Sequence, residues 1–294
     1  MKKRIVFHPG DHVGITVCSN GLKREQKEEI ERLRKCLNEM GLIPVFSELL
    51  YETHSVFSGS GKERAQELMR FFEEDKIKAI FDVSGGDLAN QLLEYLDYEK
   101  IKQAEKPFFG YSDLTVLLNG IYAKTGSSTF LYQIRNLIRR DEKEQKQRFK
   151  ETFLEGGSSL FQSEWKFLQG EEIKGNVAGG NIRCFLKLAG TPYFPDLTDK
   201  VLFLESLGGE EAVMTSLLTQ LRQLGVFQKA CGILLGTFTK MQQMQREAPI
   251  EELVKKIVDD PKMPIAKTEQ IGHGSNSRCL MIGEHIEVRK EKIR

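Results

Sequence analysis

Apolar residues in the first part of the chain follow two patterns in turn, a short continuous run and then a spacing of three to four residues. Residues 13–17 are a β-branched apolar run, and the stretch after it carries Ile30, Leu33, Leu37 and Met40 before Gly41. A short apolar run predicts a buried strand, whereas the longer period predicts an amphipathic helix. The chain is therefore expected to begin with a strand followed by a helix.

The same alternation continues to about residue 131. Apolar runs predict strands at 43–46, 79–83, 108–111 and 129–131, and helical spacing predicts helices at 63–74 and 113–124. Strands that alternate with helices of this length are typical of a parallel sheet with covered faces, whose ligands bind beyond the carboxyl ends of the strands. We therefore predict an α/β amino-terminal domain of this kind.

A change of composition separates this region from the rest. Residues 139–150 are almost wholly charged or amide-bearing, which predicts a solvated helix, and Gly156-Gly-Ser-Ser159 follows. A chain of 294 residues is long enough for two domains. We place an α/β domain at 1–155, a linker at 156–172 and a second domain at 173–294.

The second domain is predicted to be smaller and of mixed α/β type. Apolar runs at 173–178, 201–205 and 231–235 predict strands, and residues 210–224 and 250–258 have helical spacing. The tail from Met263 alternates short strand patterns with turns. Any site that uses both domains is expected to lie between them.

Charge and composition narrow the class of partner. The 43 basic residues nearly balance the 42 acidic ones, so neither nucleic acid nor an anionic membrane is an expected partner, and a small molecule is. No apolar window approaches a membrane span, and His8, Pro9 and Asp11 interrupt what a signal peptide would need to keep apolar. We therefore expect a cytoplasmic protein.

The cysteines and histidines do not suggest a metal. Five scattered cysteines in apolar runs are typical of reduced core thiols, and no histidine has metal-ligand spacing to another ligand. We expect no metal and no cofactor.

Ser112 is the first candidate for chemistry, because the strand pattern 108–111 breaks there directly into a helix. At such a corner a hydroxyl is presented at the edge of the sheet, next to the unpaired amides of the first helical turn. Serine is also a common helix cap, and Leu114 stands where the hydrolase motif Gly-x-Ser-x-Gly has its second glycine. Both readings remain open from this stretch alone.

Three other positions have a functional and an ordinary reading. Gly85 and Gly86 end a predicted strand and can form a tight turn or a close approach to a ligand. Glu205 ends another strand, either as a rim carboxylate or as a group held for catalysis. His273, between two glycines, is either an exposed loop residue or a general base.

Several short motifs in one order resemble the LD-carboxypeptidase family, the muramoyl-tetrapeptide carboxypeptidases, whose other branch contains the microcin C immunity peptidases. They are Pro9-Gly-Asp-His-Val-Gly-Ile15, Gly85-Gly86, Gly110-Tyr-Ser-Asp113, Gly179-Gly-Asn181, Gly190-Thr-Pro192, Leu202-Phe-Leu-Glu205 and Gly272-His273. None is specific by itself. Their order and spacing over nearly the whole chain carry the resemblance.

The resemblance implies a serine peptidase with Ser112 as nucleophile, His273 as general base and Glu205 as the carboxylate that orients it. It also implies an oxyanion hole made by the amides of Gly86 and Asp113, and a homodimer. A serine hydroxyl needs a base to become a good nucleophile, and a carboxylate stabilises the imidazolium that forms. Candidate substrate contacts are Gly85, Trp165, Asn181 and Arg183.

Two substrate classes fit the resemblance, a murein tetrapeptide that loses its terminal D-Ala and a peptide or aminoacyl nucleotide. The short path from Trp165 to Gly179 favours the tetrapeptide, whereas residues 95–99 and 121–126 are more similar to the microcin-type branch. A non-catalytic binding protein of the same fold is a third reading. It is disfavoured because Ser112, Glu205 and His273 are all present.

Overall fold

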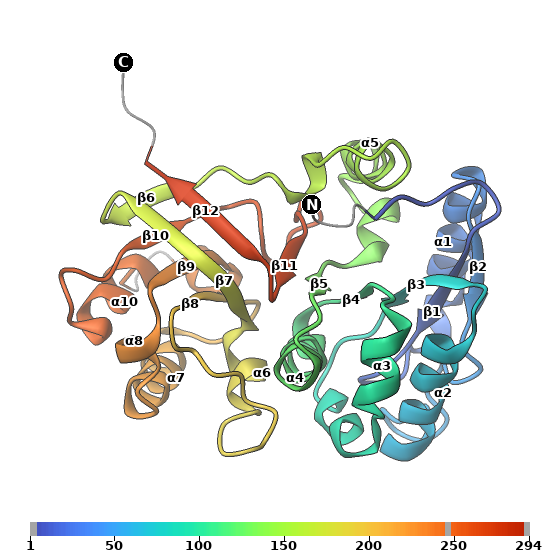
Figure 1. The fold of residues 1–294 in the computed structure, drawn as a ribbon, viewed down its shortest axis with the longest axis horizontal. Coiled ribbons are helices and arrows are strands. Elements are labelled where there is room, and N and C mark those ends of the chain that lie inside the picture. The colour runs from blue at the N-terminus through green and yellow to red at the C-terminus, as the bar shows by residue number, and fades with distance from the viewer. Residues whose placement is uncertain (1–4, 245–247, 291–294) are drawn as a thin grey trace.

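The computed structural model contains two sheets with helices around them, and it describes residues 5–244 and 248–290 (Figure 1). The basic opening of the chain, residues 1–4, lies outside the described part. The first half of the chain builds most of one sheet and the second half builds the other. The two-domain α/β class predicted from the sequence is confirmed.

The first sheet has the strand order β11-β5-β4-β3-β1-β2. Strands β1 to β5 are parallel, and β11 runs antiparallel to β5 at one edge. The strands are β1 (His12–Thr16), β2 (Ile43–Phe46), β3 (Ile77–Asp82), β4 (Phe108–Gly110), β5 (Thr129–Leu131) and β11 (Leu280–Ile282).

Helices connect these strands as the hydrophobic spacing predicts. The α-helices are α1 (Lys27–Glu39), α2 (Gly61–Glu73), α3 (Tyr98–Ala104), α4 (Thr115–Thr125) and α5 (Glu142–Phe153). The 3-10 helices are η1 (Arg24–Gln26), η2 (Ala89–Tyr95), η3 (Ser112–Leu114), η4 (Ile134–Ile138) and η5 (Ser159–Phe161). The charged helix α5 buries Phe149 and Phe153, whose rings pack on Phe81 and Phe109 of the sheet, together with Gln145 and Thr152.

The second sheet has the order β12-β7-β8-β9-β10-β6, with parallel strands in the centre and antiparallel strands at both edges. Its strands are β6 (Lys166–Gln169), β7 (Glu172–Asn181), β8 (Lys200–Ser206), β9 (Gly232–Phe238), β10 (Ile265–Lys267) and β12 (His285–Arg289). The helices beside it are α6 (Ile182–Leu186), α7 (Glu211–Gln223), α8 (Val226–Lys229), α9 (Thr239–Gln243) and α10 (Ile250–Val258).

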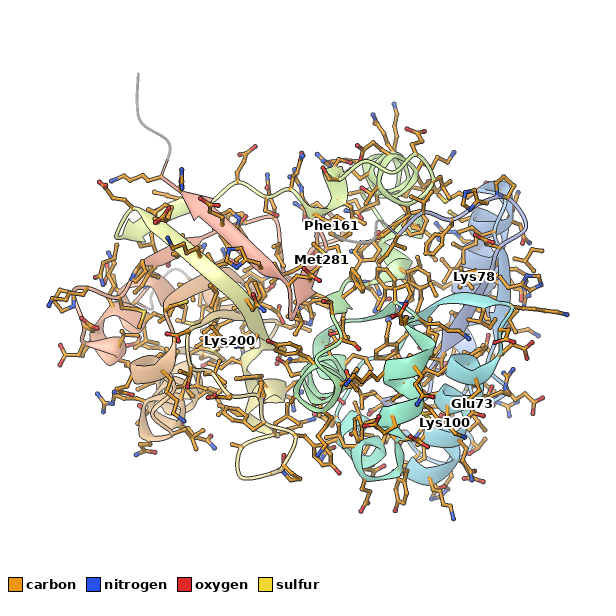
Figure 2. The ribbon with its side chains drawn as sticks, viewed as in Figure 1. Glu73, Lys78, Lys100, Phe161, Lys200 and Met281 are labelled. Atoms are coloured by element: carbon orange, nitrogen blue, oxygen red, sulfur yellow. The ribbon has the colours of Figure 1, made fainter. Side chains whose placement is uncertain are left out.

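Two segments differ from the simple division of the sequence. The segment 156–172, predicted as a linker, contains η5 and β6, and β6 pairs with β10 in the second sheet. Strand β11 comes from the second half but covers the open edge of β5, where an unpaired strand would be exposed. Its Met281 packs on the same core cluster as Phe161 of η5 (Figure 2). The exact domain boundaries stay a prediction.

Helix α4 lies where the two halves meet, opposite α6 (Figure 1). Residues on every side of α4 are buried, among them Leu117, Asn119 and Ile121. A helix that is buried all round needs partners on all faces, and here one continuous apolar cluster includes residues of α4, α6 and the second sheet. The start of α4 is therefore fixed by both halves of the protein.

Candidate active site

Ser112 lies at the corner between β4 and α4 in a strained backbone conformation. Tyr111 is extended, whereas Ser112 has a φ of 59°, in the left-handed region. This conformation costs a non-glycine residue about 1–2 kcal/mol and is concentrated at functional sites. Tyr111, not Ser112, occupies the cap position of η3, so the hydroxyl of Ser112 is not used to cap the helix.

The hydroxyl of Ser112 instead faces an imidazole. His273 Nε2 lies 3.1 Å from Ser112 Oγ, and His273 Nδ1 lies 2.7 Å from Glu205 Oε2. With a proton on Nδ1, the ring donates to Glu205 and accepts from Ser112, which satisfies both contacts. The structure therefore brings together three residues that are far apart in the sequence.

These three side chains differ in burial. Glu205, at the carboxyl end of β8, is fully buried, while the side chain of His273 is 12% exposed and Ser112 is partly exposed. A carboxylate in this position is strongly coupled to its neighbours because little water screens it. The set of contacts is therefore buried at Glu205 and opens to solvent at Ser112.

Two further residues hold this arrangement. Asn181 Nδ2 donates to Glu205 Oε1 over 3.1 Å, and its Oδ1 accepts from the amide of Cys184. The ring of Tyr111 packs edge-on against the imidazole of His273, with centroids 4.9 Å apart. The sequence suggested Asn181 as a substrate contact, but its amide is buried and both ends are used within the protein. These contacts favour a role in orienting Glu205.

Gly86 and Asp113, the expected oxyanion-hole residues, follow β3 and Ser112 respectively. Gly86 has a φ of 127°, and a Cβ there would come within 2.2 Å of the side chain of Asn20. Only glycine fits this turn without displacing Asn20. The amide of Asp113 belongs to the first turn of η3, where backbone N–H groups have no partner within the helix.

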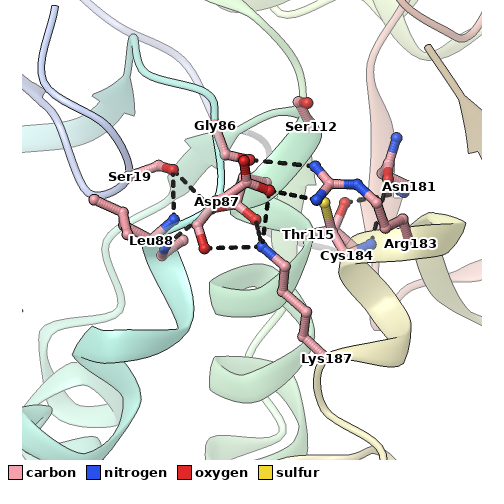
Figure 3. Close-up of polar contacts among 12 residues, drawn as sticks. Ser19, Gly86, Asp87, Leu88, Ser112, Thr115, Asn181, Arg183, Cys184 and Lys187 are labelled. Atoms are coloured by element: carbon pink, nitrogen blue, oxygen red, sulfur yellow. Dashed lines mark hydrogen bonds and ion pairs between the residues drawn. The ribbon is translucent and has the colours of Figure 1, made fainter. Parts of the chain in front are cut away.

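The carboxylate of Asp113 is fully buried and has three partners. Ser19 Oγ donates to Oδ2 over 2.6 Å, the amide of Ala89 donates to Oδ2 over 2.9 Å, and Lys187 Nζ contacts Oδ1 at 2.6 Å. Lys187, labelled in Figure 3, comes from the segment that directly follows α6. The residue after the serine is therefore fixed through its side chain.

Arg183 lies on the rim of this region. Its guanidinium pairs with the carboxylate of Asp87 and donates to the carbonyl of Gly86 over 3.4 Å (Figure 3). The Arg183 contact holds the pKa of the Asp87 carboxyl below its usual range. Both side chains are more than half exposed, so Arg183 is accessible to a ligand.

The remaining predicted contacts are less closely tied to the serine. Gly85 is partly exposed and has open space where a Cβ would be. Trp165 is partly buried against the apolar cluster that includes the second sheet, just before β6. Neither residue contributes to the hydrogen bonds that link Ser112, His273 and Glu205.

Asp82, at the end of β3, holds the start of the loop that carries Gly86. Its carboxylate accepts from the amides of Cys18 and Ser84 and from the hydroxyl of Ser84, each over 2.6 Å. Burial raises the pKa of Asp82 to about 6, although these hydrogen bonds oppose the shift. Ser84 Oγ in turn accepts from the amide of Ser19.

Sequence reasoning missed Ser19, Asp82, Tyr111 and Lys187. Ser19 and Asp82 lie at the carboxyl ends of β1 and β3, so the rule that ligands bind at these ends was a signal for both. Tyr111 was readable only as a strand residue. Lys187 carried no signal, because a lysine after a short helix is expected from sequence to be an ordinary surface residue.

Among residues 5–244 and 248–290, no three His, Cys, Asp or Glu side chains gather in a way that would hold a metal ion. All five cysteines are free, and four are buried. No helix in the same ranges is long and apolar enough to cross a membrane.

Comparison with known proteins covers both halves of the chain. Residues 13–132 match the model of the LD-carboxypeptidase N-terminal domain, and residues 174–288 match that of the LD-carboxypeptidase C-terminal domain. A Bacillus subtilis (strain 168) protein named "Probable murein peptide carboxypeptidase" is 27% identical, over 94% of this chain and 88% of its own.

A microcin immunity protein is also among the relatives. The Escherichia coli microcin C7 self-immunity protein MccF is 26% identical, over 95% of this chain and 90% of its own. A solved structure of MccF in complex with glutamyl sulfamoyl guanosine has the same fold, with a TM-score of 0.87 and 24% identity, over 97% of this chain and 95% of that one. Two matched domains in the family's order, together with relatives that align over nearly the whole length, show that this chain belongs to the LD-carboxypeptidase family.

Proposed function

We propose that this protein is a serine carboxypeptidase that hydrolyses the amide between an L-centre and a terminal D-residue, releasing D-Ala from a murein tetrapeptide. The observation that carries the proposal is the continuous set of contacts from Ser112 Oγ through His273 to Glu205. Relatives named as carboxypeptidases support the reaction class.

Each residue of this set has a role that follows from its chemistry. His273 Nε2 removes the proton as Ser112 Oγ attacks the scissile carbonyl, and buried Glu205 stabilises the imidazolium. The amides of Gly86 and Asp113 donate to the oxyanion. His273 then protonates the leaving amine of D-Ala, and water hydrolyses the acyl-enzyme with the same base.

A carboxypeptidase must also recognise a terminal carboxylate. Arg183 is our candidate, since it is exposed, contacts the carbonyl of Gly86 and can exchange Asp87 for a substrate carboxylate. Gly85 offers open space on the same loop, and Trp165 offers an apolar surface.

The alternative substrate is a peptide or aminoacyl nucleotide, which the similarity to MccF favours. Residues 166–181 form β6 and β7, joined only by Gly170 and Glu171, so few side chains there can cover a nucleobase. Base stacking on an aromatic ring is worth about 1–3 kcal/mol in nucleic-acid complexes. Without such cover, the tetrapeptide is the better substrate.

The test compares the two substrates with purified protein. We expect release of D-Ala from L-Ala-D-Glu-L-diamino acid-D-Ala, with a kcat/KM above that for an aminoacyl sulfamoyl nucleotide, because the ratio reports differential transition-state binding. The Ser112→Ala variant is the control for contaminating activity. Cleavage of the nucleotide alone would replace the proposed substrate with the alternative.

The homodimer that the family resemblance implies and the cytoplasmic location stay predictions. Light scattering of the purified protein at micromolar concentration tests the first, and fractionation of the source cells tests the second.

A further inference from the structure

One ammonium group, that of Lys187, contacts both loops that carry the proposed oxyanion-hole amides. Its Nζ lies 2.6 Å from Asp113 Oδ1 and donates to the carbonyl of Asp87 over 2.9 Å. Asp113 follows Ser112 directly, and Asp87 follows Gly86 (Figure 3). The two loops belong to the first half of the chain, whereas Lys187 comes from the second.

We propose that Lys187 is a positioning residue that sets the separation of the Gly86 and Asp113 amides and so completes the oxyanion hole. The inference rests on the proposed serine mechanism. Donors to an oxyanion act only when they are held at the correct distance before the reaction, and removing one costs about 10²–10³-fold in kcat. Because Lys187 contacts the loops of both donors, its loss is expected to lower kcat by a comparable factor.

Burial makes this contact specific. The carboxylate of Asp113 is inaccessible and Lys187 is 19% exposed, so water does not replace the ammonium without a change of structure. The other charges that face this ammonium are Asp87, whose carboxylate lies 3.6 Å away, and Arg183, which is bound to that same carboxylate. Ser19 and Ala89 donate to the second oxygen of Asp113, and Lys187 contacts the first.

The short segment 181–187, which carries Lys187, also contacts Glu205. Asn181, at the start of α6, donates to Glu205, and Lys187, just after α6, reaches Asp113. Residues 181–187 therefore align the base and the oxyanion loops together. The competing explanation is that Lys187 only docks the two halves of the protein.

Steady-state kinetics on the tetrapeptide separate these explanations. We expect Lys187→Met to lower kcat by about 10–100-fold with KM changed by less than about threefold, and Lys187→Arg to recover part of the loss. The control is Lys100→Met, which removes the exposed Lys100–Glu73 ion pair of 2.8 Å between α3 and α2 (Figure 2). It should leave kcat and KM unchanged. A Lys187→Met variant with lower thermal stability but the wild-type kcat, or with a higher KM alone, would overturn the proposal.

Two further measurements separate the proposed role of Lys187 from a loss of folding and from a wrong choice of substrate. Since Lys187→Met leaves a buried charge unpaired, the double variant Asp113→Asn, Lys187→Met removes both charges, and it should fold and remain slow. Labelling of Ser112 by a fluorophosphonate requires the oxyanion hole but no peptide, so slow labelling of Lys187→Met supports the proposal even if the tetrapeptide is not the substrate. Wild-type protein that neither cleaves the tetrapeptide nor reacts with the fluorophosphonate would refute the serine mechanism on which the proposal rests. Equal labelling rates of wild type and Lys187→Met would refute the role of Lys187.

Discussion

At the scale of single residues, the strained backbone of Ser112 gives the first prediction. Its φ of 59° is a conformation that glycine adopts freely and other residues do not, so the backbone of Ser112 is held against its own preference. Surrounding contacts must offset the free-energy cost of this backbone conformation. They include the contact of Ser112 with His273 and the packing of the buried neighbours Tyr111 and Leu114. Stability and reactivity are therefore opposed at this position.

The first prediction compares two substitutions of this serine. Both Ser112→Ala and Ser112→Gly lose the hydroxyl and should lose about 10³-fold or more in kcat. Only glycine relieves the backbone strain, so Ser112→Gly should be more stable than Ser112→Ala by about 1 kcal/mol. Calorimetry of the two variants measures the difference. Equal stability would mean that the corner stores no strain.

At the scale of elements, the turn after β3 brings the chain close to the Ser19–Asn20 turn after β1. The amide of Asn20 donates to the carbonyl of Gly85, and Asn20 Oδ1 accepts from the amide of Asp87. These bonds leave no room for a side chain at Gly86. Two neighbouring strand ends thus shape one loop.

The second prediction uses the adjacent glycines as a matched pair. Gly86→Ala must displace Asn20 and adopt a φ that alanine disfavours, so it should lower stability by about 1–3 kcal/mol and lower kcat. Gly85→Ala enters open space at an ordinary φ and should change stability by less than about 0.5 kcal/mol. Urea denaturation distinguishes them, and similar effects of both substitutions would contradict this account of the loop.

Sequence reasoning predicted the elements and singled out Ser112, Glu205 and His273 for different reasons. The strands and helices of the first half were readable from spacing, because β1 and α1 bury the residues that the pattern assigns to them. Ser112, Glu205 and His273 were suggested by their places at strand ends and between glycines, and the family resemblance gave them roles. Strand β11 was not recognised as part of the first sheet, since three residues carry no signal for a partner. The contacts of Lys187 depend on how the two halves meet, which no local pattern encodes.

At the scale of the whole molecule, the buried Asp82 links pH to global unfolding. Its pKa is about 6 in the folded protein against an ordinary value of 3.8, so the native state keeps a proton that the unfolded chain releases between these values. The stabilising contribution is present below about pH 4 and is lost as the pH rises through 6. A shift of this size corresponds to roughly 3 kcal/mol.

The third prediction follows from that dependence. The Asp82→Asn variant cannot titrate, so the difference in unfolding free energy between wild type and variant should change by roughly 2.4 kcal/mol between pH 4 and pH 7, with wild type relatively more stable at the acid end. Urea denaturation at several pH values provides the measurement. A difference that is constant with pH would show that Asp82 does not carry this linkage.

The position of β11 has a consequence for when the protein becomes active. His273 lies between β10, in the second sheet, and β11, in the first, and it follows the serine that it contacts by 161 residues. A growing chain that has just completed the amino-terminal strands has no base for Ser112, and its β5 edge is still uncovered. On the proposed mechanism, a chain truncated before residue 273 holds Ser112 without its base, and we expect such a product to show no hydrolase activity.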